Sequence, residues 1–274
     1  MKKYFRRQIA IPTDHGSWIF LLSPLLIGLT AGKSWSLASF FLILAAFSAF
    51  LLRQPITTAV KIVSKRRPKT DMPAVIFWTT IYGAILIMAL AGLTVLGHAE
   101  IVFLSIPAIP IFAWHLYLVS KRSERRQAGV EILGSGVLAL SAPAAYWVGM
   151  DNYAPLGWWL FILTWLQSAA SIVYAYLRLE QRELAKKPDL KTQLVMGKRA
   201  LLYTTFNFLA VSIFSIGSIL PPLLPIPYAV QWAETIWGCF RPSIGWKPAR
   251  IGFRQLIVSI LFTVLFMITW NTTW

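Results

Sequence analysis

Between residues 155 and 182, five polar side chains recur at helical spacing within an otherwise apolar segment. Because successive residues of a helix are about 100° apart, these side chains fall within a stripe of roughly 80° on one face. Two of them are arginines, whose planar guanidinium groups can hold a phosphate through paired hydrogen bonds. The stripe therefore predicts an anion-binding site, and its members are Gln167, Ser171, Tyr174, Arg178 and Arg182.

Further cations lie in short basic segments elsewhere in the chain. If these segments meet at one membrane surface, their side chains would complete a cradle for phosphate. The arginines also have a simpler interpretation, in which long basic side chains mark the edge of a membrane helix and extend their charge into water. Both interpretations stay open, and the additional candidates are Arg53, Arg66, Arg67, Lys121 and Arg122.

Two polar residues outside these groups are also candidates. Glu234 shares a polar stripe with Tyr228 and Gln231 in an apolar segment. A carboxylate at membrane depth costs roughly 2.5–3.5 kcal/mol, so it should face the bundle or a cavity. If the prolines of PPLLPIP break this helix, Glu234 instead lies near the cytoplasmic edge. His15, which precedes a glycine, is a candidate for contact with a bound head group.

The elements that must position these residues are membrane helices. Hydrophobic residues make up 57% of the 274 residues and charged residues only 13%, whereas a soluble domain carries about 25% charged residues. Apolar runs of roughly 20 residues can cross a bilayer as helices. The sequence predicts an all-α, polytopic membrane bundle forming a single domain over residues 1–274. We expect about nine spans, at 14–32, 35–52, 74–96, 100–119, 130–149, 155–178, 200–220, 222–240 and 254–270.

The positions of the basic residues predict the orientation. Every Lys and Arg except Lys33 falls in alternate connectors, and such residues are retained on the cytoplasmic side of short loops. We therefore expect the N-terminus inside, the C-terminus outside, and a multi-pass protein of the cytoplasmic membrane. Because the charge lies in connectors rather than on one soluble face, membrane lipids are the expected partners and nucleic acid is not. The inside segments are 1–13, 53–73, 120–129, 178–199 and 241–254.

This layout resembles that of the UbiA-type intramembrane prenyltransferases, which have nine helices and long cytoplasmic loops after helices two and six. HGSWIFLLSPLLIGLTAG resembles the family's opening helix, and SKRRPKT resembles the Arg-Pro that closes the helix-two loop. LYLVSKRSERRQAGVEILGSGVLALSAPAA resembles a Tyr-Pro-x-x-Lys-Arg segment, and SIVYAYLRLEQRE resembles the end of helix six. The resemblance implies that helices two and six are neighbours around a cavity that opens to the cytoplasm and binds an isoprenoid phosphate.

The resemblance also implies a metal site that this chain does not reproduce. UbiA-type enzymes hold two Mg²⁺ ions between two Asp-rich motifs, and the metals bind the diphosphate of the prenyl donor. Phe50, Leu51, Gln54 and Thr58 stand where the first motif needs Asn and Asp. In the second motif Arg178 and Arg182 replace aspartates, and only Glu180 keeps a carboxylate. We predict no cofactor, and Mg²⁺ would be expected only if an acidic motif lay elsewhere, at Glu131, Glu180 or Glu234.

A closer resemblance is to the YwiC-like family of bacterial membrane proteins. PTDHGSW resembles its opening Pro-x-x-His-Gly-Ala-Trp, and RQP resembles its Arg-x-Pro after helix two. EILG and APAA resemble its Glu-x-x-Gly and Ala-Pro-Ala in helix five. The chain is identified as a member of this family, which implies little about chemistry. Three functions stay open: binding of a phosphate-headed lipid, with or without altered prenyltransferase catalysis; transport of a small anion; and a non-catalytic assembly role.

Overall fold

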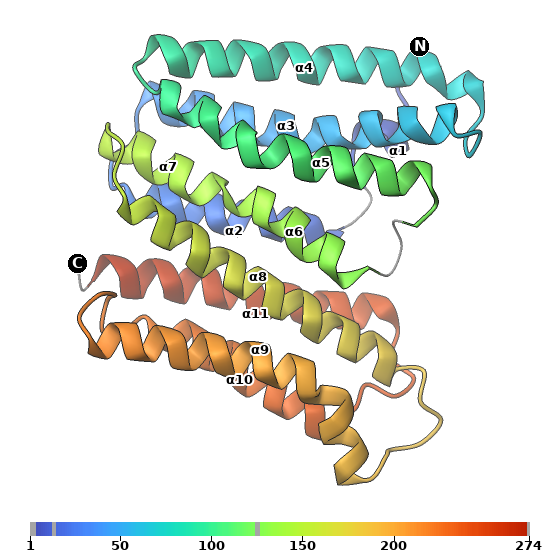
Figure 1. Cartoon of the computed structure of the whole chain (residues 1–274), viewed down its shortest axis with the longest axis vertical. Helices are drawn as coiled ribbons and strands as arrows, with labels where there is room; N and C mark the ends of the chain where they lie inside the picture. Colours follow the sequence, from blue (N-terminus) through green and yellow to red (C-terminus); the bar gives the residue numbers. More distant parts are fainter. Residues whose placement is uncertain (1–3, 13–14, 124–126, 273–274) are drawn as a thin grey trace.

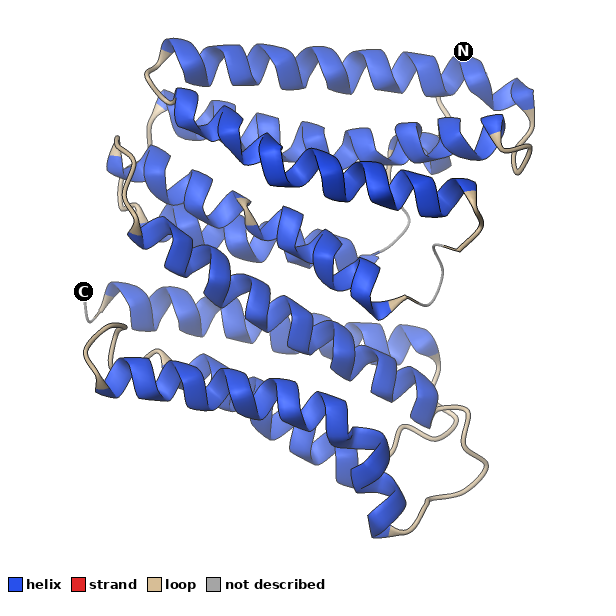
Figure 2. Ribbon diagram, in the orientation of Figure 1, coloured by secondary structure: helices blue, strands red, loops and turns tan. Residues whose placement is uncertain are grey.

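The computed structural model describes residues 4–12, 15–123 and 127–272, and within these ranges it contains helices and no strand (Figures 1 and 2). Most of the helices run roughly parallel or antiparallel to one another (Figure 1). They are Arg7–Ala10 (α1), His15–Ala31 (α2), Leu37–Val63 (α3), Met72–Val95 (α4), Ser105–Ser120 (α5), Ala128–Ala139 (α6), Ser141–Met150 (α7), Leu156–Gln181 (α8), Leu190–Ile216 (α9), Pro225–Phe240 (α10) and Pro248–Asn271 (α11), with 3₁₀ turns at Lys69–Asp71 (η1) and Ala99–Leu104 (η2).

Each predicted span coincides with helical structure. In the described part of the chain, seven helical segments are long and apolar enough to cross a membrane. The predicted all-α membrane bundle is therefore confirmed. α2 is a shorter apolar helix and α10 has 16 residues, so neither is among the seven. The number of crossings and their direction stay predictions.

The helices form three groups along the long axis of the molecule. α3, α4 and α5 lie at one end, α2, α6 and α7 in the middle, and α8 to α11 at the other end (Figure 1). α2 packs so closely against α7 that no side chain would fit at Gly28, where a Cβ would lie only 2.2 Å from the Ala142 carbonyl oxygen. Such close approach of two backbones is what small residues permit between membrane helices.

The predicted contact between helices two and six is wrong. The corresponding helices, α3 and α8, form no interface: α3 packs on α4, α5 and α7, whereas α8 packs on α6, α7 and α9. In Figure 1 the middle group of helices separates them. The cavity that the UbiA-type resemblance implies between these two helices is therefore not formed by direct packing of α3 on α8.

The two long connectors predicted at 53–73 and 178–199 are shorter in the structure, because their flanking helices continue further than predicted. Their side of the membrane stays a prediction. α3 runs through Pro55 to Val63, leaving only residues 64–71 as a connector, and residues 182–189 join α8 to α9. The extension of α3 is stabilised by burial, since Ile62 packs in an apolar cluster with Ile9 and Val75.

Prolines affect three of the predicted spans, and one of the breaks falls at an unexpected place. α10 begins at Pro225, so the first two prolines of PPLLPIP precede the helix. Pro110 lies inside α5, which follows a 3₁₀ turn. An unexpected break falls at Leu140, between α6 and α7, because Pro143 has no N–H to bond the Ala139 carbonyl.

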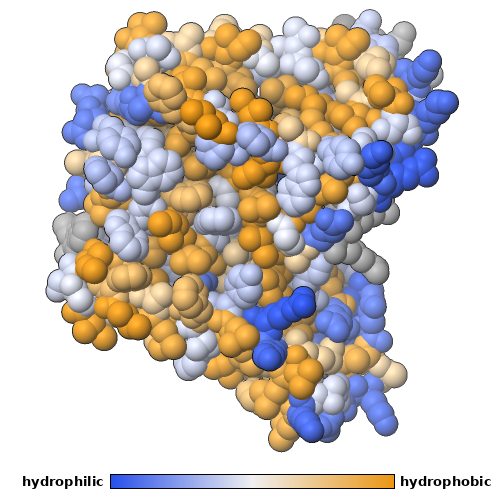
Figure 3. All heavy atoms as spheres, in the orientation of Figure 1, coloured by the Kyte–Doolittle hydropathy of each residue, from blue (hydrophilic) through white to orange (hydrophobic). Residues whose placement is uncertain are grey.

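Connectors lie at two ends of the bundle, and most of the basic residues in the described part of the chain lie at one of them. The α3–α4, α5–α6, α8–α9 and α10–α11 connectors all lie at the right-hand side of Figure 1. Hydrophilic side chains line the same edge of the surface, while hydrophobic ones cover much of the middle (Figure 3). We call this side, with its four connectors, the basic end. Lys33 lies in the α2–α3 connector on the opposite side.

Candidate anion-binding site

Arg178 lies at the centre of the polar cluster where α8, α10 and α11 meet at the basic end. Its side chain is only 1% exposed. Its Nη1 lies 2.8 Å from Gln181 Oε1, 2.7 Å from the Gly238 carbonyl oxygen and 2.8 Å from that of Arg241. Carbonyls in the last turn of a helix have no partner within the helix. Arg178 therefore completes the C-terminal end of α10.

The connector that follows α10 is fastened to the end of α8. The Ser243 hydroxyl donates to the Arg178 carbonyl at 2.6 Å, and the Gly245 N–H donates to the Arg182 carbonyl at 3.1 Å. Arg182 is partly buried and contributes its backbone to this connection. The predicted arginine pair thus organises the connector, with Arg178 acting through its side chain and Arg182 through its carbonyl.

Glu234 faces into the bundle and forms a bidentate ion pair. Its two oxygens accept from Arg254 Nε at 2.6 Å and Nη2 at 2.7 Å. The Tyr174 hydroxyl donates to Glu234 Oε1 at 2.9 Å. The Glu234 side chain is 10% exposed and lies in the half of α10 nearer the basic end. It therefore faces other helices of the bundle, while its depth in the membrane stays a prediction.

The remaining polar residues of the α8 stripe face α10 and α11. Gln231 Nε2 donates to the Gln167 carbonyl at 3.2 Å, and the Ser171 hydroxyl donates to Gln255 Oε1 at 3.4 Å. These pairs lie further from the basic end than the Glu234–Arg254 pair. The polar stripe predicted from helical periodicity therefore lies at the buried interface between α8 and its neighbouring helices.

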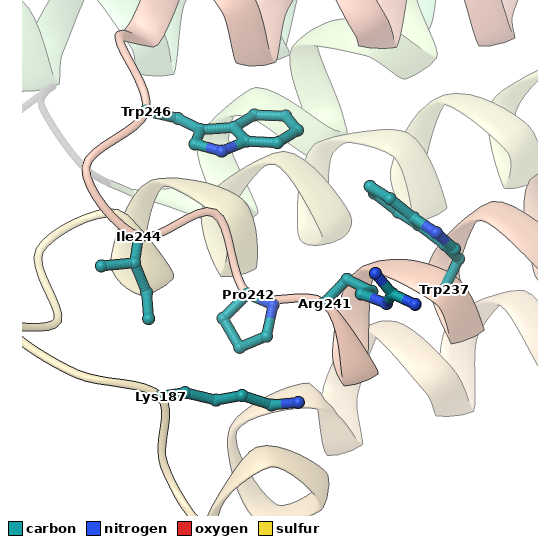
Figure 4. Close-up of a pocket in the computed structure, with 6 residues that line it drawn as sticks. All are labelled: Lys187, Trp237, Arg241, Pro242, Ile244 and Trp246. Atoms are coloured by element: carbon teal, nitrogen blue, oxygen red, sulfur yellow. The ribbon is translucent and has the colours of Figure 1, made fainter.

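Beside this cluster is an open cleft of about 520 Å³ (Figure 4). No carboxylate is among the described residues that line it. Its two cations are exposed and come from different connectors, Lys187 from α8–α9 and Arg241 from the end of α10. The cleft therefore combines positive charge with an aromatic and apolar wall, and its lining is Lys187, Trp237, Arg241, Pro242, Ile244 and Trp246.

Guanidinium groups lie next to both tryptophans of the cleft. Arg254 Cζ is 3.8 Å from the centroid of Trp237, and Arg250 Cζ is 4.0 Å from that of Trp246. Arg178 Cζ lies 5.6 Å from the first ring and 5.2 Å from the second. Each distance is within the range of a cation–π interaction. We call these five side chains the Arg–Trp ladder.

The other predicted cations lie in a different part of the basic end. Arg53 is 5.6 Å from the Phe50 ring, Arg66 donates to the Val119 carbonyl, and Lys121 is 5.7 Å from the Tyr117 ring. Arg67 pairs with Asp71, and Arg122 is exposed in the α5–α6 connector. The structure does not bring these residues to the cleft, so the predicted single cradle is divided. The side chain of His15 is outside the described part.

Sequence reasoning missed most of the residues that form the cleft. Tryptophan most commonly lies at the membrane interface in such proteins, so its presence alone does not indicate a binding site. A signal was nevertheless present, because Trp246, Arg250 and Arg254 recur at intervals of four residues. That spacing places them on one face of a helix and its approach. No cluster of His, Cys, Asp and Glu that could hold a metal occurs among the described residues.

The apolar helices, with their charges gathered at the ends, define a multi-pass helical membrane protein. The profile of the family described as "YwiC-like protein" matches residues 11–146. The chain is also 27% identical over 264 residues to the Bacillus subtilis (strain 168) protein designated "Uncharacterized protein YwiC", covering 92% of this chain and 94% of that protein. It belongs to the YwiC-like family, as the motifs predicted. No solved structure matches the chain. The cleft lies C-terminal to the region that the profile matches.

Proposed function

We propose that this protein binds a phosphate-headed lipid, such as an isoprenoid phosphate, with the phosphate in the cleft and the apolar chain in the bilayer. The observation that carries the proposal is the composition of the cleft, in which Lys187 and Arg241 lie beside apolar and aromatic side chains without a carboxylate. Each basic residue near a membrane surface adds about 1 kcal/mol of attraction for anionic lipid. Tryptophan suits the level of the lipid head groups.

The proposed orientation places the basic end, and therefore the cleft, on the cytoplasmic side of the cytoplasmic membrane. This follows from the retention of basic connectors inside the cell. A reporter fused to the C-terminus should then behave as extracytoplasmic. Cytoplasmic labelling of that fusion would contradict the orientation and would move the cleft to the other membrane face.

The two Mg²⁺ ions of UbiA-type enzymes do not fit this cleft. Mg²⁺ binds oxygen ligands, above all carboxylates, whereas the cleft presents an ammonium and a guanidinium group. Glu234, whose partner Arg254 stacks on Trp237, already accepts from Arg254 through both oxygens. The lipid is therefore bound directly by cations, and no prenyl-transfer step is assigned to these residues.

The test is a calorimetric titration of the purified protein with a short-chain isoprenoid phosphate. Binding should survive EDTA and weaken with added salt, because it is mainly an interaction of charges. The double change Lys187→Ala and Arg241→Ala should weaken it at least tenfold. Lys65→Ala with Lys69→Ala removes two exposed charges from the α3–α4 connector and serves as the matched control. Strict dependence on Mg²⁺, or an equal loss in both double variants, would overturn the proposal.

Transport of a small anion is the second candidate. The polar pairs Gln231–Gln167 and Ser171–Gln255 favour it, because they continue the polar cluster from Glu234 towards the middle of the helices. Reconstituted vesicles loaded with phosphate would distinguish the two functions. Protein-dependent release of phosphate would favour transport, whereas binding of the lipid without release favours the first proposal.

A further inference from the structure

The two tryptophans of the cleft could in principle bind a different kind of head group. Aromatic faces attract quaternary ammonium groups such as choline. In this cleft, however, guanidinium groups already lie against the rings, with Arg254 3.8 Å from the Trp237 centroid and Arg250 4.0 Å from the Trp246 centroid. A choline group would have to displace an arginine to reach the face of either ring that a guanidinium already covers.

The charges around the cleft oppose a cationic head group as well. Lys187 and Arg241 line the cleft, and the guanidinium of Arg178 lies 5.6 Å and 5.2 Å from the centroids of its two indoles. Glu234 cannot balance an incoming cation, because both of its oxygens accept from Arg254 and one also accepts from Tyr174. A cationic head group in the cleft would therefore be repelled by these like charges, since the effective dielectric constant near a protein surface is well below that of water.

Arg178 gives a further reason why the cleft favours a head group whose negative charge is not balanced by a cationic substituent. Its Nη1 donates to three oxygens, but its Nη2 is buried without a hydrogen-bond partner among the described residues. The three acceptors of Nη1 are an amide and two carbonyls, so no carboxylate pairs directly with this guanidinium. An anion in the adjacent cleft would lower the electrostatic cost of burying it.

We infer that the cleft selects among phosphate head groups and takes those without a cationic substituent. The preferred ligand is a phosphomonoester, or a phosphodiester whose second substituent is neutral, and head groups bearing choline are excluded. The Arg–Trp ladder determines this selectivity, because a guanidinium covers one face of each indole and adds positive charge. The inference rests on the proposed function, since it concerns the same cleft.

The experiment compares two short-chain lipids with identical dihexanoyl chains, phosphatidic acid and phosphatidylcholine, together with inorganic phosphate. The purified full chain should bind phosphatidic acid at least tenfold more tightly than phosphatidylcholine. Inorganic phosphate should bind more weakly than phosphatidic acid, because it lacks the apolar chains. Equal binding of the two lipids would overturn the selectivity but leave the proposed function standing. Binding of inorganic phosphate alone, or no binding at all, would overturn both.

A variant of the ladder tests its role directly. Arg250→Gln exposes one face of Trp246 and removes one charge, so binding of phosphatidylcholine should strengthen and the preference should fall to about threefold or less. Lys247→Gln is the matched control, because it removes an exposed charge next to the cleft that is not stacked on a ring. The control should keep the full preference. An equal change in both variants would overturn the role of the ladder.

Discussion

The basic end has two arginine-rich corners that use their charge differently. In the corner between α3 and α4, Arg6 and Arg67 both pair with Asp71, which is 4% exposed. In the corner formed by α8, α10 and α11, the lining of the cleft contains two cations and no carboxylate. A local excess of basic residues therefore does not identify a binding site. What distinguishes the second corner is positive charge left unneutralised beside a hollow.

The first corner holds an end of the chain in place. Tyr82 donates to the Ala10 carbonyl at 3.1 Å, and Trp78 donates to the Tyr4 carbonyl at 3.1 Å. Ile9 packs in an apolar cluster with residues of α3 and α4. Together with the Arg6–Asp71 ion pair, these contacts fix the segment before α2 against the bundle. The basic residues of this corner therefore have a structural role.

The largest effect is expected for Arg178→Ala. The variant removes a buried cation that donates to Gln181, Gly238 and Arg241, and hydrogen bonds from charged groups contribute roughly 1.5–3 kcal/mol each. We expect the free energy of unfolding to fall by about 3 kcal/mol or more, measured by denaturant unfolding in detergent. Arg178→Met keeps much of the volume and should also destabilise.

The control for this change is Arg182→Ala, since Arg182 holds the connector through its backbone carbonyl rather than its side chain. That variant should lose about 1 kcal/mol or less. Equal losses at residues 178 and 182 would show that the buried guanidinium does not organise the cleft corner, and the contrast between the two corners would lose its structural basis.

An intermediate effect is expected for Glu234→Gln. The amide cannot reproduce the bidentate pair with Arg254, so stability should fall by about 1–3 kcal/mol. Releasing Arg254 also adds a free charge near the cleft. Binding of the isoprenoid phosphate should therefore become tighter at low salt and more sensitive to salt. Tighter binding with no change in salt dependence would contradict this account.

The helices of the two corners could be predicted from the sequence, but the contrast between the corners could not. Apolar runs located α4 within about two residues at either end, and helical periodicity correctly grouped Ser171, Tyr174 and Arg178 on one face of α8. The partners of Arg178 are backbone carbonyls of α10, and every residue offers a carbonyl, so residue types carry no signal for such a contact. The burial of Asp71 likewise depends on the position of Arg6, which is 65 residues away.

The errors of the sequence reading have one physical source. Charge patterning locates connectors at a membrane face but contains no information about which connectors are adjacent on that face. The single cradle containing Arg66 and Arg178 depended on their segments meeting at one membrane surface, with α3 and α8 as neighbours around a cavity. The packing of α2 and α7 between them separates the two groups.

The smallest effect is expected for Asp71→Asn, and it is the sharpest comparison of the two corners. The change leaves Arg6 and Arg67 without their shared carboxylate. Their side chains are 41% and 34% exposed, so water can solvate them and the loss of stability should be about 1 kcal/mol. The corner would then carry unneutralised arginines, as the cleft does, but without the wall that Trp237 and Trp246 give the cleft. We therefore expect unchanged affinity and stoichiometry for the isoprenoid phosphate in the same calorimetric titration. A second binding event in this variant would show that free positive charge at the basic end is sufficient by itself, and that the cleft adds nothing to recognition.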